Sequence, residues 1–181
     1  MIKWLLNRTI ATFEKKFDYD ASYMHDLVDA SPRAARKFAK VMGLTSYRED
    51  VPPDALVAAG LATTLFEDCG PCTQLGVTMA EREGVAPATI RAILAGDERA
   101  MPPDAALGYR FAQMTLRHDP AADELREQIV TRWGKRALVS LAFAITAGRI
   151  FPTLKYALGH GKSCSLVRVG GAPAPVARKA A

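Results

Sequence analysis

The chain has 181 residues, of which 49% are hydrophobic and 24% charged, and its formal net charge is +5. This length supports one domain with or without a short extension, and the hydrophobic fraction excludes a wholly disordered chain. Three cysteines are too few for a disulfide scaffold, so we expect a reducing environment. Because the N-terminal residues lack the pattern of a signal peptide, we expect a cytoplasmic protein.

Helical periodicity, capping residues and helix breakers divide the chain into helices. Apolar residues recur at helical spacing over 2–17, which predicts a helix that packs on the domain or on a neighbouring subunit. Ser31 before Pro32 predicts a helix start, and Gly43 its end. Further helices are predicted over residues 53–67, 69–83, 87–95, 103–118, 121–133, 135–151 and 153–158.

Alternating patterns typical of strands are nearly absent from the rest of the chain. Only residues 165–171 have the composition of a short extended segment. The longest apolar run, residues 137–148, is too short to span a bilayer and predicts a buried helix. We therefore expect an all-α fold without a membrane contact. We divide it into an N-terminal helical extension (1–50), a helical core (51–165) and an extended or disordered tail (166–181).

The basic charge is spread unevenly along the chain. The net charge is +2 over residues 1–50, −4 over 51–120 and +7 over 121–181. A nucleic-acid-binding protein usually carries a stripe of lysine and arginine along one helix. Here the C-terminal basic residues do not share one helical face, so we do not expect nucleic-acid binding.

The segment with evident chemistry is the Cys-Gly-Pro-Cys motif at residues 69–72. With Asp68 as N-cap, Cys69 and Cys72 lie in the first turn of a helix, where the partial positive charge favours thiolates. Glu67 and Asp68 oppose this effect by raising the pKa of the thiols. The spacing predicts thiol–disulfide chemistry. Two buried structural cysteines, or a zinc site completed by Cys164 and histidines, are the alternatives. We expect neither a metal nor a cofactor.

The helices around this motif carry a family resemblance. Thioredoxins share the four residues, but there the pair follows a strand, whereas the preceding segment here is predicted to be helical. An all-helical chain with Cys-x-x-Cys at the start of a core helix resembles the alkylhydroperoxidase D-like, or carboxymuconolactone decarboxylase-like, family. The resemblance covers roughly residues 53–162. It implies a multihelical bundle, a homo-oligomer and a redox-active disulfide, and residues 1–50 would be an added helical arm.

This chain departs from the pattern of the peroxidase members of that family. Those members have a glutamate twelve residues before the first cysteine, a histidine just before the second, and a histidine four residues after it. Here these positions hold Val57, Pro71 and Gly76, so only Cys69 and Cys72 match. The decarboxylase branch works without the cysteine pair, and no matching base is present here, so decarboxylation is not expected.

Peroxide reduction needs a thiolate and a proton for the departing oxygen, so another group must replace the missing relay. The candidates are Glu67, Gln74 as a hydrogen-bond donor, His118 and His160. His160 interests us most because Cys164 lies close to it in the sequence. Cys164 itself is expected to be a packed or surface thiol, with a role as third redox partner the alternative.

Two hypotheses about function follow. The first is a thiol-dependent oxidoreductase that reduces a small peroxide or exchanges disulfides, with a protein partner as reductant. The resemblance favours Cys72 as the attacking thiol, whereas the position at the helix terminus favours Cys69; we favour Cys72. The second is a non-catalytic oligomeric or redox-sensing relative that kept the fold but lost the proton relay. Whether the chain is an enzyme stays open at this stage.

Overall fold

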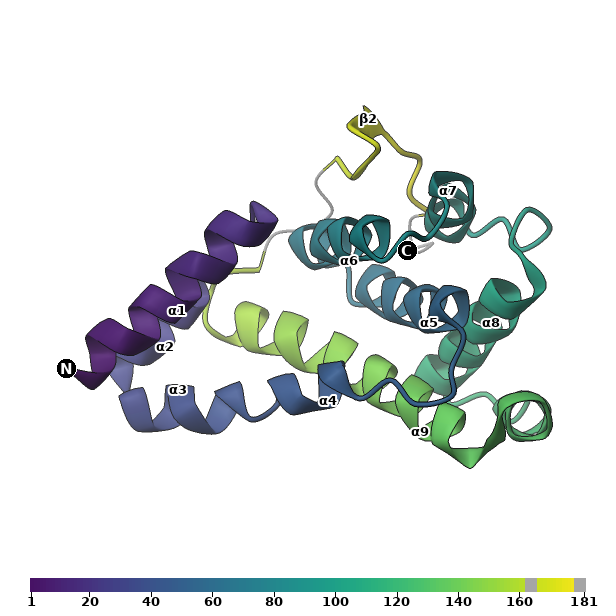
Figure 1. The fold of residues 1–181 in the computed structure, drawn as a ribbon, viewed down its shortest axis with the longest axis horizontal. Coiled ribbons are helices and arrows are strands. Elements are labelled where there is room, and N and C mark those ends of the chain that lie inside the picture. The colour runs from purple at the N-terminus through teal and green to yellow at the C-terminus, as the bar shows by residue number, and fades with distance from the viewer. Residues whose placement is uncertain (162–165, 178–181) are drawn as a thin grey trace.

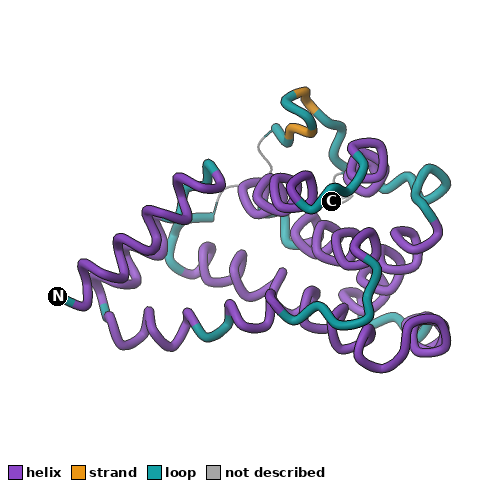
Figure 2. The backbone as a smooth tube through the Cα atoms, in the orientation of Figure 1, coloured by secondary structure: helices purple, strands orange, loops and turns teal. Residues whose placement is uncertain are grey.

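The computed structural model describes residues 1–161 and 166–177. Of these residues 72% are helical, which confirms the all-α fold class (Figures 1 and 2). The elements are α1 (Ile2–Phe17), α2 (Ser22–Ala30), α3 (Pro32–Ala39), α4 (Met42–Ser46), α5 (Pro53–Phe66), α6 (Gly70–Arg82), α7 (Pro87–Ala95), α8 (Pro103–Arg117), α9 (Ala122–Ala157), β1 (Arg168–Val169) and β2 (Ala172–Pro173).

The core is built around α5, which packs against α6, α7, α8 and α9. Small residues on α5 make this possible, because Ala55, Ala58, Ala59 and Ala62 are fully buried there. The closest approach is to α8, where a Cβ on Gly108 would overlap the backbone carbonyl of Ala55. Helix α5 is therefore the central element, and its sequence is apolar on every side, as expected for a helix surrounded by others.

The N-terminal arm, α1 to α4, lies along one side of the core (Figure 1). The predicted helix over 2–17 is confirmed. Its later turns pack Ile10, Phe13 and Phe17 against a small buried cluster that contains Tyr19 and Tyr23. Its first turns leave apolar side chains exposed, namely Ile2, Trp4 and Leu5. The expected contact of this helix with a second subunit stays a prediction.

The arm differs from the prediction in two ways: it contains a helix that was not predicted, and one helix ends earlier than expected. Helix α2 follows a short linker in which the backbone N–H of Ser22 donates to Asp20 Oδ1 (3.0 Å); the sequence pattern did not predict it. The prediction that Gly43 ends the helix after Pro32 is wrong, because that helix ends at Ala39 and Gly43 lies inside α4. A glycine ends a helix when it takes a positive φ. Gly43 is not among the glycines with a positive φ.

Helix α9 joins three segments that were predicted as separate helices. Gly134 has φ 87° and ψ 173°, which confirms a break at that residue. Pro152 lies inside the helix and does not end it. Among the described helices, α9 alone is long and apolar enough to cross a membrane by length and composition, a test that the core helix of a soluble protein also passes. In this structure α9 packs against α4, α5 and α8.

Residues 166–177 are extended and packed against the core. Strands β1 and β2 form a two-residue antiparallel ladder. Val169 in β1 and Val167, which precedes it, are buried. The side chain of Gln74 on α6 holds this segment, because it donates to the carbonyl of Arg168 (3.2 Å) and accepts from its N–H (2.8 Å). This tail therefore covers one side of α6.

Candidate functional site

Cys69 and Cys72 form a disulfide at the start of α6, with their Cα atoms 5.3 Å apart. Cys69 is the N-cap and Cys72 the third residue of the helix. Pro71 is tolerated in this first turn because its missing N–H has no partner within the helix anyway. Both sulfurs thus lie beside the unpaired N–H groups of a helix N-terminus, where the helix dipole favours a thiolate once the pair is reduced.

The prediction that Asp68 caps this helix is wrong. Asp68 has φ 49° and ends the preceding helix instead. Its N–H donates to the carbonyl of Leu65 and that of Cys69 to the carbonyl of Thr64, both at 3.1 Å. This is the arrangement of a Schellman motif, in which a left-handed residue reverses the chain after a helix. The motif sets the angle between α5 and α6 and presents Cys69 at the turn.

Glu67, which was predicted to belong to the site, lies near the cysteine pair. It forms an ion pair with an arginine from the basic C-terminal part of the chain. Arg149 Nε on α9 donates to Glu67 Oε1 at 2.8 Å. The Tyr156 hydroxyl, also on α9, donates to the backbone carbonyl of Asp68 at 3.1 Å. The arginine offsets the negative field that Glu67 would otherwise exert on a thiolate.

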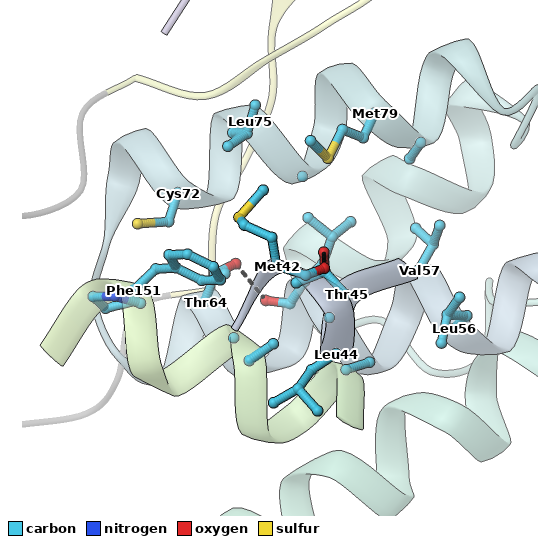
Figure 3. A pocket seen from close by; sticks show the side chains of 18 of the residues that line it. Met42, Leu44, Thr45, Leu56, Val57, Thr64, Cys72, Leu75, Met79 and Phe151 are labelled. Atoms are coloured by element: carbon cyan, nitrogen blue, oxygen red, sulfur yellow. Dashed lines mark hydrogen bonds between the residues drawn. The ribbon is translucent and has the colours of Figure 1, made fainter. Parts of the chain in front are cut away.

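Cys72 lines an apolar cavity of about 260 Å³. Figure 3 shows Cys72, Leu75 and Met79 in succession along α6, with Phe151 of α9 near Cys72. Cys72 and Glu83, which follows the end of α6, both line the cavity. These two residues are eleven apart, so the cavity extends for about 16 Å along the helix. Helices α5 and α9 and the arm provide the remaining walls.

The cavity wall includes several polar groups. At the end away from the disulfide, Arg48 forms an ion pair with Glu83. At the end beside Cys72, the wall includes Thr64, Tyr19 and Tyr23. Most of the other lining residues are apolar, so the cavity suits an apolar molecule.

Two of the three positions where the resembling family has relay residues also line this cavity, namely Val57 and Gly76. Neither supplies a proton. A Cβ on Gly76 would lie 2.9 Å from Leu61 Cδ2, so a larger side chain could enter only if Leu61 moved. The third position, Pro71, has no ionisable group. At these three positions the chain therefore offers no proton donor.

The other predicted relay candidates lie elsewhere. His160 Nε2 pairs with Asp26 Oδ2 at 2.7 Å, and its Nδ1 lies 3.3 Å from Ser22 Oγ, so the ring joins the end of α9 to α2. His160 is not among the residues that line the cavity, and its catalytic role stays a prediction. His118 is the left-handed C-cap of α8. Gln74 holds the C-terminal tail, and Cys164 lies outside the described residues.

Sequence reasoning missed a buried polar group beside the cavity. Lys155 is 5% exposed, and its Nζ donates to the Tyr19 hydroxyl at 3.2 Å. The same Nζ lies 4.9 Å from the ring centre of Tyr19 and 5.3 Å from that of Tyr23. Burial raises the pKa of Tyr19 to about 12 and also raises the pKa of Tyr23. The sequence signal was weak, because Tyr19 lies in a linker and its partner is 136 residues away.

Within the residues that the structure describes, no group of three or more histidine, cysteine or acidic side chains is arranged to hold a metal ion. The disulfide and the cavity are thus the features that carry chemistry at this site. No protein-family model, no curated protein and no solved structure matches this chain.

Proposed function

We propose that the chain is a dithiol oxidoreductase that reduces small apolar hydroperoxides. The observation that carries this proposal is that Cys72 both pairs with Cys69 and lines the apolar cavity. A reducible pair at the end of a ligand-sized apolar space has what such a reaction needs: a place for the organic group and a sulfur beside it.

The reaction balances with the two cysteines as the electron donors. The thiolate of Cys72 attacks one oxygen of the hydroperoxide, the O–O bond breaks, and the alkoxide leaves and takes up a proton. Cys72 is now a sulfenic acid. The thiol of Cys69 attacks this sulfur, water leaves and the disulfide forms. Two thiols and one hydroperoxide thus become a disulfide, an alcohol and a water, and an external dithiol must reduce the pair again.

Burial supports a small substrate. Cys69 is 2% and Cys72 8% exposed, so a large protein substrate has little access to either sulfur in the oxidised state. A cavity of about 260 Å³ exceeds the roughly 150 Å³ in which an apolar protein cavity binds benzene. An aromatic or branched alkyl hydroperoxide is therefore of suitable size.

A stoichiometric titration tests this function. The reduced chain is mixed with increasing cumene hydroperoxide in the absence of reductant, and peroxide, alcohol and thiols are measured. We expect one hydroperoxide to disappear for each chain, with a Cys69–Cys72 disulfide found by peptide mass spectrometry. If both thiols persist while the hydroperoxide remains, the pair is structural or senses another oxidant, and the proposal is wrong.

Filling the cavity should separate large substrates from small ones. Gly60 lines the cavity, and a Cβ placed there would have no atom within 4 Å. We expect Gly60→Leu to lower kcat/KM for cumene hydroperoxide about tenfold or more, with little effect on hydrogen peroxide. The measurement is peroxide consumption with dithiothreitol as reductant.

A second glycine provides the matched control for this variant. Gly43 also lies inside a helix with open space around its Cβ position, but it does not line the cavity. Both substitutions improve helix propensity, so neither is expected to unfold the chain. Equal losses for Gly43→Leu and Gly60→Leu, or an equal loss for both peroxides, would show that the cavity does not hold the substrate.

A further inference from the structure

We propose that Tyr19 is the proton donor of this site: its hydroxyl, held by Lys155, hydrogen-bonds the Cys72 thiolate and protonates the departing alkoxide. Delivery of a proton to the alkoxide rests on the function proposed above, whereas the hydrogen bond to the thiolate does not. The N-terminal arm would thus supply the group that the core lacks at Val57, Pro71 and Gly76.

The two tyrosines lie at the end of the cavity that contains the disulfide. Tyr19, Tyr23 and Cys72 all line this cavity. The cluster that contains both tyrosines packs against Leu75 and Leu154. Leu75 follows Cys72 by three residues on the same helix, and residues at this spacing are neighbours on one helical face. The phenols therefore stand beside the first turn of α6.

The hydrogen bonds around Tyr19 leave its proton for an acceptor in the cavity. Its oxygen accepts from Lys155 Nζ at 3.2 Å. A phenol has one hydrogen to donate, and this bond does not use it. A donor on the phenol oxygen also stabilises the negative charge that forms as its proton leaves. Lys155 therefore supports proton donation by Tyr19.

The phenols keep their protons at neutral pH, which a donor requires. Burial raises the pKa of Tyr19 to about 12, well above its ordinary value near 10. Lys155 is 5% exposed and lies over both rings, where an ammonium is attracted to the aromatic faces. After the proton has moved, the Lys155 ammonium, 3.2 Å from the Tyr19 oxygen, would stabilise a Tyr19 phenolate.

Among the described residues, other charged groups lie near the cysteine pair or near Tyr19, although none of them lines the cavity. From the turn before α6 these are Glu67 and Asp68, and Arg149 on α9 pairs with Glu67. Asp20 lies beside Tyr19 and opposes its ionisation. Arg149 would lower the pKa of the thiol and the carboxylates would raise it. The test therefore compares variants that leave all of these charges in place.

Site-resolved alkylation measures the hydrogen bond without any peroxide. The reduced chain is treated with iodoacetamide at a series of pH values, and the modification of Cys72 is followed by peptide mass spectrometry. We expect Tyr19→Phe to raise the midpoint of Cys72 alkylation by about one pH unit, because a thiolate that loses a hydrogen bond is less stable. With cumene hydroperoxide, the rate constant should fall about 100-fold, the usual contribution of a general acid.

Tyr109→Phe is the matched control. Tyr109 is also a buried tyrosine with a raised pKa, but its hydroxyl is bonded to Gln113 on the same helix and it does not line the cavity. We expect its alkylation midpoint to match the wild type. Lys155→Met should shift the midpoint in the same direction as Tyr19→Phe.

The two proposals fail in different ways. An unchanged Cys72 midpoint in Tyr19→Phe overturns the role of Tyr19, whether or not the wild type consumes hydroperoxide. A wild type that leaves hydroperoxide intact overturns the proposed function, while the alkylation series still decides whether Tyr19 contacts the sulfur. A shifted midpoint with an unchanged peroxide rate limits Tyr19 to thiolate stabilisation and contradicts proton donation.

Discussion

Cys72→Ser should lose hydroperoxide consumption altogether, by roughly a thousandfold or more. Serine is a much weaker nucleophile than a thiolate at neutral pH, and Cys72 is the cysteine that lines the cavity. Cys69→Ser should behave differently. It should consume one equivalent of cumene hydroperoxide in a single burst and then stop, because the sulfenic acid on Cys72 has no thiol to resolve it.

Rapid-mixing assays with and without dimedone separate these results. Dimedone should label Cys72 in Cys69→Ser after the burst and should label nothing in Cys72→Ser. Cys164→Ser is the control, because it removes the third thiol and leaves the pair unchanged. A burst in Cys72→Ser with none in Cys69→Ser would reverse the roles of the two cysteines. Full turnover in both variants would contradict a dithiol reaction.

Gly108→Ala should lower the free energy of unfolding by about 3 kcal/mol, at the upper end of what overpacking costs. The added methyl group would overlap the carbonyl group of Ala55. That neighbour is backbone in the central helix α5, so no side-chain rotation can relieve the overlap. The two helices must move apart, and much of the core packs on one or the other of them.

Urea denaturation followed by circular dichroism measures this loss. For a chain of this length, about 3 kcal/mol corresponds to a decrease of roughly 10 °C in Tm. Gly43→Ala is the control: its Cβ would meet nothing within 4 Å, so better helix propensity should stabilise the chain by a few tenths of a kcal/mol to about 1 kcal/mol. A Gly108→Ala variant as stable as the wild type would show that α5 and α8 do not pack this closely.

Local signals predicted most of the helices and the place of the cysteine pair. A helix start at proline and a helix break at glycine both depend on the local sequence. The break at Gly134 could therefore be predicted from the sequence. The misassigned residues are those for which two local rules compete. Asp68 can cap a helix or end one in the left-handed region, and Gly43 can end a helix or lie inside it. Packing between distant helices decides such cases.

Periodicity, capping and spacing are properties of nearby residues, so they were enough to predict a helical protein with two cysteines at a helix start. The packing of the helices places Cys72 in the wall of a cavity and brings Lys155 to Tyr19, 136 residues away in the sequence. It also brought the positive charge of the last third of the chain to the negative middle third, where Arg149 pairs with Glu67. Such contacts depend on how distant helices pack, and no local pattern contains that information.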